Sequence, residues 1–398
     1  MFHKKGLSDI DLKDKRVLVR ADYNVPVENG VIEDDYRITQ SIPTLEALIE
    51  QGCKIVVMSH LGRPKGKVVK GLSLKPVAKR LTQLLGQEVL FAESAVGAKT
   101  LSQVHNLRPG QVLLLENLRY HAQEVGDSDD FAAHLAQYGD VFVQDGFGVV
   151  HREHASTHAI TKLLPSVAGL LLEREVREIT RATKHPKKPT VGVVGGAKIH
   201  TKIELLDNLM PILDRLIIGG AMSNTFLVAM EMEVGKSLYD EEELDVARKV
   251  IQQCRDENVQ LILPLQDVAV AKKLDHKARR RVIETEKVKK DDIILDIGTK
   301  TIASVLENLK DAGTVIWNGP VGMIEIPAFK KGSEEIAQFI VKNKIDSVVG
   351  GGDSVELVDD LGLMDGFTHV STGGGAALEL MSGLPLPGVE SLLDKRSH

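Results

Sequence analysis

The sequence predicts two doubly wound, Rossmann-like α/β domains, each a parallel sheet covered by helices, joined by a long helix and a hinge. Three observations predict this fold. Short runs of Val, Ile and Leu alternate with longer amphipathic stretches, which is typical of parallel sheets flanked by helices. A segment rich in Pro and Lys separates one such series from a second. The length of 398 residues suits two to three domains.

The first series of predicted strands belongs to an N-terminal domain, which we place at residues 1–170. Its strands are the apolar runs RVLVRAD (16–22), KIVVMS (54–59), VLLLEN (112–117) and DVFVQD (140–145). Amphipathic stretches, such as the one ending near Gln51, predict the covering helices. Ligands of such sheets bind at the carboxyl ends of the strands, so functional residues are expected there.

The two series are connected by a segment that we place at 171–189. The stretch LLLEREVREITRAT predicts one long helix, and KHPKKPT (184–190) predicts a linker after it. The second series defines a C-terminal domain at 190–375. Its strands are VGVVGG (191–196), RLIIGG (215–220), QLILPL (260–265), TVIWNG (314–319) and DSVVGG (346–351).

Composition excludes several classes of protein. The formal net charge is −6, so the molecule as a whole does not attract nucleic acid, and any anion site must come from local clusters of Lys and Arg. Cys53 and Cys254 belong to no C-x-x-C pair, which argues against a zinc or redox site and against a disulfide framework. The N-terminal stretch has no signal-peptide pattern, and the apolar run at 163–172 is too short to span a bilayer. We therefore expect a cytoplasmic protein without a membrane partner.

Polar side chains follow several predicted strands of the first domain. Taken singly, each Arg is best explained as a solvated charge and each His as a structural residue. Taken together, they converge on one edge of one sheet, and cations gather in a cleft only where an anion neutralises them. Arg suits bidentate contact with phosphate or carboxylate. We therefore predict a small polyanionic ligand, with its hydroxyls held by Asp22 and Asn24 and its charge met by Arg37, His60, Arg63, Arg119 and Arg152. The stretch VVHREHAST (149–157), which supplies Arg152, also contains His151 and His154.

Glycine clusters at strand-to-helix junctions predict a nucleotide site in the second domain. They lie in VVGGAKIHTKIELL (193–206), VVGGGDSVELV (348–358) and THVSTGGGAALELMSG (368–383). Glycines let the backbone approach phosphates, and helix N-termini favour negative charge. Lys198 and Lys202 share one helical face if the helix starts early, and the bland alternative is two solvated lysines. Asp353 stands where Mg²⁺ on nucleotide phosphates would need a carboxylate, and TVIWNGPVGMIE adds Asn318 and Glu325.

Two familiar nucleotide motifs are incomplete. VGKS (234–237) resembles the end of a Walker A loop, but the earlier glycine would fall at Met230. No stretch completes G-x-G-x-x-G, since the third glycine after Gly373 and Gly375 would be Leu378. An NAD-dependent dehydrogenase is therefore disfavoured. A binding protein, or an inactive relative that has kept the fold, remains the other alternative.

At these motifs the chain closely resembles the phosphoglycerate kinase family. The resemblance runs nearly end to end and keeps the family's order. It is carried by RADYNVP, SHLGRP, ENLRYH, HREHAST, GGAKIHTKI, GGAMSNTF, GKSL, WNGPVGMIE, GGGDS and STGGGAALEL.

The resemblance implies a monomeric, hinge-bending kinase of glycolysis that transfers a phosphoryl group between 1,3-bisphosphoglycerate and ADP, with Mg²⁺ bound to the nucleotide. It implies that 3-phosphoglycerate is held by Asp22, Asn24, Arg37, His60, Leu61, Gly62, Arg63, Arg119 and Arg152. It implies that ATP or ADP is held by Gly196, Lys198, Lys202, Gly219, Gly220, Asn318, Glu325, Gly350, Gly351, Gly352, Asp353, Ser354, Gly373 and Gly374. Arg37, Lys198 and Lys202 would be catalytic, Asp353 would contact the Mg²⁺, and residues 376–398 would pack back on the N-terminal domain.

The sequence departs from the family's usual pattern at four places. Tyr23 stands where the family usually has Phe, and QDGFG (144–148) stands where it usually has Asn-Asp-Ala-Phe-Gly. Ala221 replaces the third glycine of a Gly-Gly-Gly turn, and Thr299 replaces a usual Pro. None of these changes removes a charged group from the expected site. Their expected effect is on nucleotide affinity and preference.

Overall fold

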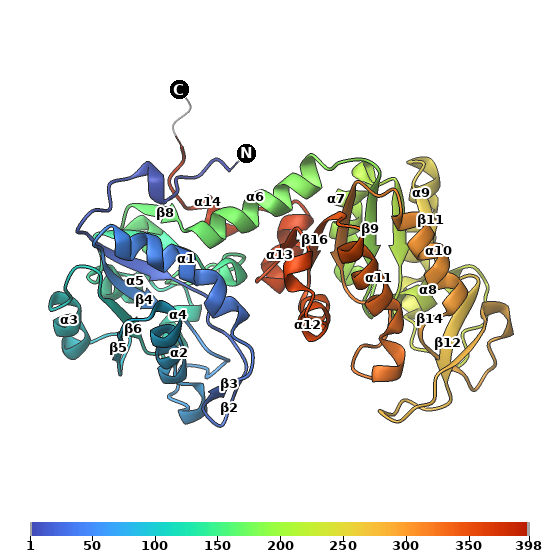
Figure 1. Cartoon of the computed structure of the whole chain (residues 1–398), viewed down its shortest axis with the longest axis horizontal. Helices are drawn as coiled ribbons and strands as arrows, with labels where there is room; N and C mark the ends of the chain where they lie inside the picture. The colour runs from blue at the N-terminus through green and yellow to red at the C-terminus, as the bar shows by residue number, and fades with distance from the viewer. Residues whose placement is uncertain (1, 396–398) are drawn as a thin grey trace. The chain divides into compact units, whose positions relative to one another are not determined.

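The computed structural model describes residues 2–395, which divide into two compact units. Unit 1 combines the chain up to Arg177 with the chain from Pro385 onward, and unit 2 is Glu178–Leu384. The boundary falls within the expected long helix, α6 (Leu170–Lys184). Each unit contains a six-stranded parallel sheet, so the predicted fold class is confirmed (Figure 1).

The sheet of unit 1 has the strand order β5-β6-β4-β1-β7-β8, and every neighbouring pair is parallel. The four predicted strands are present, and two further strands, β5 and β8, were not predicted. The bounds are β1 (Arg16–Arg20), β4 (Lys54–Met58), β5 (Val89–Ala92), β6 (Val112–Leu115), β7 (Val141–Gln144) and β8 (Ser166–Ala168). A small hairpin, β2 (Val27–Glu28) and β3 (Val31–Ile32), follows β1.

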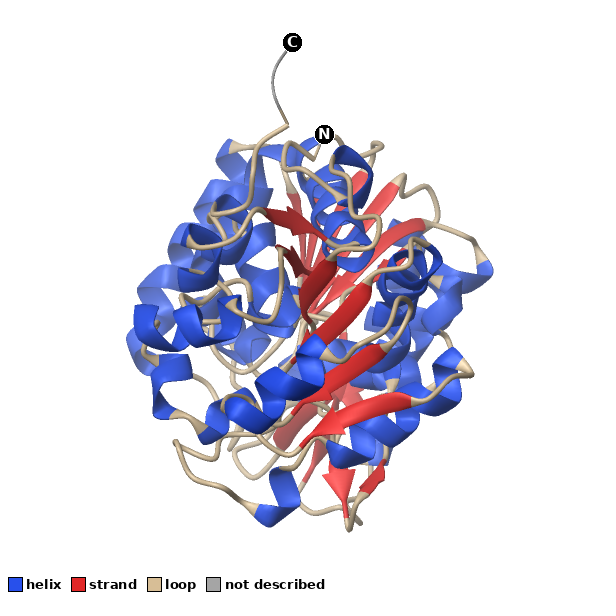
Figure 2. Cartoon of the chain, turned by 90° about the vertical axis from the view of Figure 1, so that its left-hand side faces the viewer, coloured by secondary structure: helices blue, strands red, loops and turns tan. Residues whose placement is uncertain are grey.

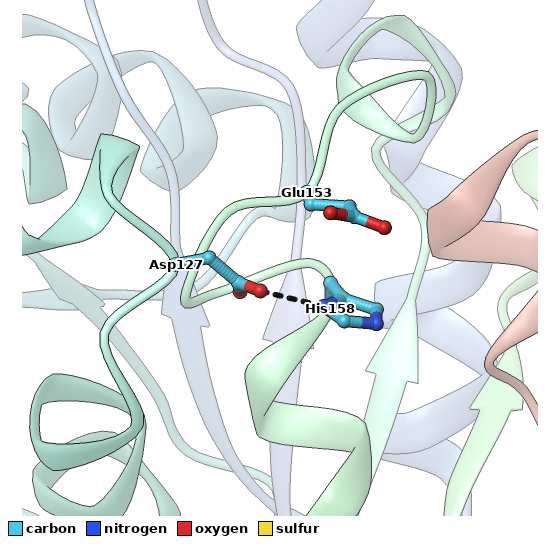
Figure 3. A group of neighbouring side chains, drawn as sticks. All are labelled: Asp127, Glu153 and His158. Carbon is cyan, nitrogen blue, oxygen red and sulfur yellow. Dashed lines mark hydrogen bonds and ion pairs between the residues drawn. The ribbon is translucent and has the colours of Figure 1, made fainter.

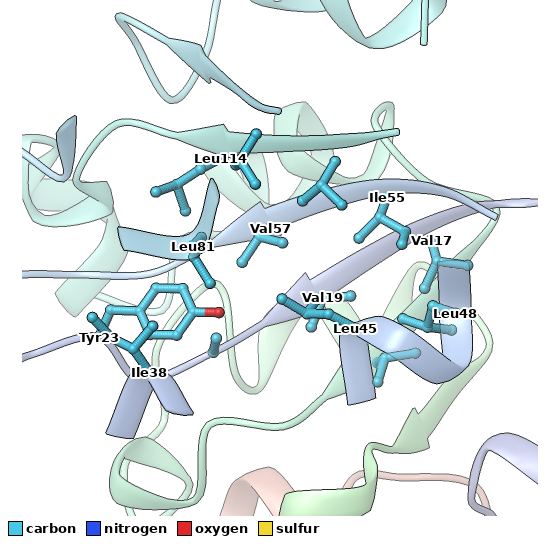
Figure 4. Close-up of a cluster of buried hydrophobic side chains, with 14 of the residues drawn as sticks. Val17, Val19, Tyr23, Ile38, Leu45, Leu48, Ile55, Val57, Leu81 and Leu114 are labelled. Carbon is cyan, nitrogen blue, oxygen red and sulfur yellow. The ribbon is translucent and has the colours of Figure 1, made fainter. Parts of the chain in front are cut away.

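Helices cover both faces of this sheet. In the cartoon, helices lie on either side of the strands (Figure 2). All residues of β6 and β7 are buried, as expected for strands with no solvent-facing side. On one face Leu45 of α1 and Leu81 of α2 pack with Val19 and Val57 of the strands (Figure 4). The helices are α1 (Tyr36–Glu50), α2 (Lys75–Leu85), α3 (Ala98–His105), α4 (Ala122–Val125), α5 (Asp129–Ala136) and α14 (Pro387–Glu390).

The main sheet of unit 2 has the order β11-β10-β9-β15-β16-β17 and is also parallel. Its strands are β9 (Thr190–Val194), β10 (Arg215–Ile218), β11 (Gln260–Ile262), β15 (Thr314–Asn318), β16 (Asp346–Gly350) and β17 (His369–Val370). The strand order reverses between β9 and β15, which is where such sheets bind nucleotides. A second, antiparallel sheet was not predicted; it consists of β12 (Asp267–Ala271), β13 (Arg281–Glu284) and β14 (Ile293–Ile297).

The helices of unit 2 extend further along the chain than the sequence suggested. The last of them, α13 (Gly374–Met381), packs against α7 and β16, so residues 376–384 lie in unit 2. The C-terminal segment contacts unit 1 from Pro385 onward, where Gly388 N donates to Val150 O at 2.8 Å. The other helices are α7 (Ile203–Leu209), α8 (Met222–Ala229), α9 (Leu244–Asp256), α10 (Thr299–Leu309), α11 (Lys331–Lys342) and α12 (Gly352–Asp360). Across residues 2–395, no helix has the length and apolar character needed to cross a bilayer.

Candidate active site

The carboxyl ends of the unit 1 strands meet at one edge of the sheet. Backbone hydrogen bonds tie the following segments together: Ala21 N donates to Met58 O, and Leu118 N donates to Ser59 O, both at 3.1 Å. The segments after β1, β4 and β6 are therefore held as neighbours. The predicted acid-binding side chains project from this edge in two groups.

The first group surrounds Asp22. Arg37 NH1 lies 3.3 Å from Asp22 Oδ2 and donates to Asn24 O at 3.0 Å. His60 Nδ1 lies 3.7 Å from Asp22 Oδ1. The side-chain oxygen of Asn24 accepts Gly62 N at 2.8 Å. This group thus combines one guanidinium, one carboxylate, one amide and one imidazole.

The second group is a cationic pocket of about 490 Å³. Arg63, Arg119 and Arg152 line it together with Lys65, and none of its described lining residues is acidic. Arg119 NH1 donates to Gly62 O at 2.9 Å, which joins this pocket to the first group. Its Nε is buried and has no hydrogen-bond partner, so an anion there would satisfy it. Burial lowers the pKa of Arg119 to about 10, which leaves the side chain charged at neutral pH.

Two histidines at this edge, His60 and His154, have lowered pKa values. Burial, with nearby cations, lowers the pKa of His154 to about 4 and that of His60 well below its usual value. His151 and His154 each have a buried Nδ1 that forms no hydrogen bond with any of residues 2–395. Leu61 is buried and its carbonyl accepts from Asn117 Nδ2, so it supports the loop. The histidines therefore contribute hydrogen bonds to this site, and the guanidinium groups contribute the charge.

In unit 2, glycines allow the segments after β9 and β15 to touch. A Cβ on Gly195 would lie 2.0 Å from Pro320 O, and one on Gly319 would lie 2.2 Å from Gly195 O. A Cβ on Gly219 would lie 2.4 Å from Val321 Cβ. These glycines shape the site through close packing.

Between the two strand ends lies a pocket of about 230 Å³ that contains Lys202. Lys202 Nζ donates to Asn318 Oδ1, and the Nδ2 of Asn318 is buried without a partner. Burial lowers the pKa of Lys202, and the nearby charge of Asp353 opposes that shift. The pocket therefore offers an ammonium and an unused amide donor. Its lining is Gly195, Gly196, Ala197, Thr201, Lys202, Asn318, Gly319, Gly351, Gly352 and Asp353.

Two helix N-termini meet beside this pocket. α12 begins at Gly352, after Gly351 with φ +95°, and α13 begins at Gly374, after Gly373. A Cβ on Gly374 would lie 3.3 Å from Gly352 N, so the first turns of the two helices are in contact. The N–H groups of a first helical turn have no partner within the helix and favour anions.

A second, more apolar pocket of about 350 Å³ adjoins the first. The two pockets share Gly196, Ala197 and Asp353, so they form one continuous hollow. Its described lining includes Gly220, Leu238, Pro264, Leu274, Val321, Met323 and, at the exposed rim, Glu325. A wide apolar pocket that leads into a narrow donor-rich one suits a base and its phosphates.

Lys198 and Lys202 do not share a helical face, because the early helix start on which that shared face depended does not occur. α7 begins only at Ile203, and a 3₁₀ turn, η6 (His200–Lys202), precedes it. The carboxylate of Glu243 accepts the backbone N–H groups of Ile199 and His200, which holds the segment in this turn. Lys198 is exposed and lines neither of the two pockets.

Two other predicted residues support the pocket from behind. Ser354 is fully buried, and its Oγ accepts Gly319 N at 2.9 Å. A Cβ on Gly350 would lie 2.9 Å from Met381 Cε. Both residues hold the loops that form the pocket.

Several lining residues had no distinct signal in the sequence. Lys65 follows Arg63 in a loop, and nothing in the sequence separated it from an ordinary surface lysine. Lys236 lies in the rejected VGKS motif but lines the apolar pocket. Leu238 and Leu274, which are 64% and 61% exposed, could not be recognised because they come from loops distant in sequence.

Two of the departures from the family pattern fit the backbone without strain. Ala221 has φ −64° at the N-cap of α8, a conformation open to any residue. Thr299 is the first residue of α10, a position that accepts Pro and many other residues.

One group of possible metal ligands consists of Asp127, Glu153 and His158, none of which lines the pockets described above (Figure 3). Asp127 already accepts hydrogen bonds from His158 Nδ1 at 2.6 Å and from Ala159 N at 3.0 Å. These bonds account for the arrangement of Asp127 and His158 as a structural contact. Asp353 differs from it, because its exposed carboxylate has no hydrogen bond or ion pair with any described residue and faces both pockets of unit 2.

Comparison with known proteins supports the resemblance seen in the sequence. The family model for phosphoglycerate kinase matches residues 7–384. The phosphoglycerate kinase of Dictyoglomus turgidum is 45% identical over 98% of both chains, and that of Desulfosudis oleivorans is 46% identical over 98% of both. The structure of the Coxiella burnetii enzyme gives a TM-score of 0.86 at 39% identity, and that of Pyrococcus horikoshii gives 0.84 at 29%, each covering 98% of both chains. This chain belongs to the phosphoglycerate kinase family.

Proposed function

We propose that this chain catalyses the reversible transfer of a phosphoryl group from 1,3-bisphosphoglycerate to ADP, giving 3-phosphoglycerate and ATP. The supporting observation is a pair of unlike anion sites. Unit 1 has a pocket lined by four cations without an acidic residue among its described lining. Unit 2 has a glycine-walled pocket with Lys202, Asp353 and two helix N-termini.

The two groups in unit 1 suit the two ends of the acid. The phosphate of 3-phosphoglycerate would lie in the cationic pocket against Arg63, Arg119 and Arg152, since guanidinium groups bind phosphate oxygens in pairs. The hydroxyl and carboxyl ends would lie against the first group, with Asp22 and Asn24 on the hydroxyl and Arg37 on the carboxylate. The bond between Arg119 and Gly62 O fixes the spacing of the two ends.

In unit 2 the base would enter the apolar pocket, and Glu325 at its rim would accept hydrogen bonds from the ribose hydroxyls. The phosphates would then reach the start of α12. There Gly351 and Gly352 carry no side chain, and the buried Nδ2 of Asn318 lacks an acceptor. A nucleotide phosphate would supply that acceptor.

Asp353 fits a Mg²⁺ that arrives with the nucleotide. Mg²⁺ takes oxygen ligands and is commonly held by one carboxylate together with substrate phosphates and water. The exposed carboxylate of Asp353, in contact with both pockets, supplies such an oxygen. The ion would supply positive charge to the phosphate oxygens. Isothermal titration of ADP should show much less Mg²⁺ dependence in Asp353→Asn, and an unchanged Mg²⁺ dependence would rule this role out.

The chemistry requires little covalent participation by the protein. The bond between phosphorus and the acyl oxygen breaks, and a bond from phosphorus to a β-phosphate oxygen of ADP forms. Neither acceptor, a carboxylate or an ADP phosphate, carries a proton to remove, so no general base is required. Arg37 and Lys202 would stabilise the charge of the transferring group from the two sides, and positioning would contribute the rest.

The acid and the nucleotide would be held by different units, so transfer requires the units to bring them together. We infer a hinge motion around α6, which crosses the boundary between the units. Small-angle scattering should show a smaller radius of gyration with both ligands than with either one. An unchanged radius with both ligands bound would argue against closure. The same data test the expected monomer, and fractionation of the source cells tests the expected cytoplasmic location.

The activity is tested with 3-phosphoglycerate, ATP and Mg²⁺, coupled through glyceraldehyde-3-phosphate dehydrogenase to NADH oxidation. We expect NADH consumption that requires all three components and the coupling enzyme. NADH consumption without the coupling enzyme would indicate a dehydrogenase instead. Ligand binding without turnover would indicate the inactive relative.

A further inference from the structure

A buried arginine, Arg20, contacts the first group of unit 1 through His60. Arg20, the last residue of β1, is fully buried. Its Nε donates to Ser156 Oγ at 2.8 Å, its NH1 donates to Ala21 O, and its NH2 lies 3.3 Å from His60 Nδ1. Burying a guanidinium costs desolvation free energy unless partners compensate for it. The partners of Arg20 therefore indicate its role.

The charge of Arg20 is balanced by Glu124, which is also fully buried. Glu124 Oε1 lies 3.9 Å from Arg20 NH2 and accepts Ser156 Oγ at 2.6 Å. Glu124 Oε2 accepts Ser156 N at 3.1 Å. Ser156 thereby bridges the two charged groups, and its hydroxyl accepts from Arg20 while it donates to Glu124. The guanidinium is held from below with little freedom to turn.

This arrangement decides which nitrogen of His60 carries the proton. A guanidinium has only donors and stays protonated, so at the Arg20 contact His60 Nδ1 must be the acceptor. The other polar atom near His60 Nδ1 is Asp22 Oδ1, which at 3.7 Å is beyond hydrogen-bond distance. A neutral imidazole that accepts at Nδ1 carries its hydrogen on Nε2. Burial lowers the pKa of His60 and so favours its neutral form, and the nearby guanidinium groups of Arg20, Arg119 and Arg37 act in the same direction.

We propose that Arg20 is a positioning residue that locks His60 as the Nε2–H tautomer, so that His60 presents a hydrogen-bond donor to an anionic oxygen of the acid. No described residue forms a hydrogen bond with His60 Nε2, which leaves that donor available. In the other tautomer, Nε2 would present a lone pair to the anion and repel it. The identity of the acid rests on the proposed function, but the tautomer does not.

The tautomer is measured first, on the full chain without any ligand. Two-bond ¹H–¹⁵N spectra of ¹⁵N-histidine protein separate a protonated ring nitrogen from an unprotonated one, and the His60→Asn spectrum identifies the His60 signals. We expect unprotonated Nδ1 and protonated Nε2 from pH 6.5 to 8.5. A protonated Nδ1 in this range, as tautomer or imidazolium, would overturn the proposal whether or not the protein is a kinase.

Two substitutions then separate positioning from a structural role. Arg20→Lys keeps the charge, but a single ammonium on a shorter side chain cannot bond Ser156 and His60 together. We expect its KM for 3-phosphoglycerate to rise roughly 10- to 100-fold, as for one lost hydrogen bond to a charged group, while its KM for ATP stays within about twofold. Its spectrum should show a mixture of His60 tautomers. A wild-type spectrum together with a raised KM, or a mixed spectrum with an unchanged KM, would contradict the proposal.

A matched pair at His60 keeps the test valid if Arg20→Lys folds poorly. The amide nitrogen of Gln reaches the position of Nε2, whereas that of Asn reaches the position of Nδ1. His60→Gln should therefore retain more affinity for 3-phosphoglycerate than His60→Asn, by roughly tenfold. Equal losses would show that the Nε2 donor does not contribute.

Discussion

At the scale of single residues, Arg37 and Lys202 differ from most charged side chains of this chain because each faces a ligand site. Arg37 contacts Asp22 and Asn24 O in unit 1, and Lys202 contacts Asn318 in unit 2. Among the hydrogen bonds of residues 2–395, no second cationic side chain donates to the partner atoms of Arg37 or of Lys202. An anionic substrate oxygen can therefore compete with Asp22 for Arg37, or with Asn318 for Lys202, as the hydrogen-bond acceptor.

Arg37→Ala should lower kcat by roughly 10²- to 10³-fold, because one charge that stabilises the transferring group is removed. The KM for ATP should stay within about twofold, since the nucleotide site lies in unit 2. Steady-state kinetics provide both numbers. Arg16→Ala is the matched control, since Arg16 forms an exposed ion pair with Asp140 in the same unit and its kcat should not change. A near-normal kcat for Arg37→Ala would remove Arg37 from the mechanism.

Lys202→Ala should lower kcat by a similar factor from the nucleotide side. Lys198→Ala should lower kcat by a smaller factor, because Lys198 is exposed and lines neither pocket of unit 2. Lys310→Ala serves as the surface control, since Lys310 follows the end of α10 and forms an ion pair with Glu307 in the last turn of that helix. Weaker ATP binding with intact turnover in Lys202→Ala would assign this residue to ground-state binding alone.

Asp296 should make unfolding depend on pH. It lies in the wall of the apolar pocket, and burial raises its pKa to about 7. Its pKa is thus higher in the folded than in the unfolded chain, so the stability it contributes is fully present below about pH 4 and is lost as pH rises through about 7. The free energy of unfolding of the wild type, measured in urea, should fall over that interval. The contribution of Asp296 to this fall should be at most about 1.4 kcal/mol per pH unit.

Comparison with Asp296→Asn isolates that contribution. The variant should show a flatter pH profile, whatever its absolute stability, and the exposed control Asp365→Asn should keep the wild-type profile. Parallel profiles for wild type and Asp296→Asn would show that Asp296 is ionised throughout.

Many charged site residues could be located from the sequence because they follow predicted strands. Asp22, His60 and Arg119 come directly after β1, β4 and β6, and parallel strands bring such positions to one edge. The network of Arg20 could not be foreseen, since an Arg within RVLVRAD gives no sign of being buried or of its partner Glu124. The orphan Nδ2 of Asn318 likewise depends on a contact with Lys202, 116 positions away.

At the scale of elements, the site of unit 2 depends on how closely the segments after β9 and β15 approach. Gly195→Ala would place a Cβ 2.0 Å from Pro320 O, a backbone atom that cannot swing aside. We expect a loss of about 3 kcal/mol in the free energy of unfolding. Gly352→Ala is the matched control, because a Cβ there meets nothing within 4 Å and the position lies in the first turn of α12. It should change stability by less than about 1 kcal/mol.

Chemical denaturation of both variants measures the difference. Equal stabilities for Gly195→Ala and Gly352→Ala would show that the two segments separate easily, and the pocket around Lys202 would then not be preformed.

Elements with strong periodicity were predictable, and those that depend on distant partners were not. The nine apolar runs correspond to β1, β4, β6, β7, β9, β10, β11, β15 and β16. The sheet of β12, β13 and β14 was not predicted, although β12 is a buried apolar run; one of its two edge strands, β13, is largely exposed and lacks such a run. The late start of α7 depends on Glu243, whose carboxylate comes from 41 positions beyond Lys202 and caps the preceding turn.

At the scale of the whole molecule, the two proposed ligand sites are divided between the two units, with the acid site in unit 1 and the nucleotide site in unit 2. Each unit has its own sheet, its own hydrophobic core and its own anion site. The division itself was predictable from the linker at 184–190. The long helix that crosses the boundary was also predicted, from the stretch LLLEREVREITRAT. The inclusion of residues 376–384 in unit 2 depends on the packing of α13 against α7, which no local pattern reveals.

The most direct test of this division is hydrogen–deuterium exchange with one ligand at a time. With 3-phosphoglycerate alone we predict slower exchange at residues 59–66 and 117–122, and with ADP and Mg²⁺ alone at residues 195–202 and 350–356. Protection of the unit 2 segments by 3-phosphoglycerate alone, or of the unit 1 segments by ADP alone, would contradict the assignment of the acid to the arginine pocket and of the nucleotide to the glycine-walled one.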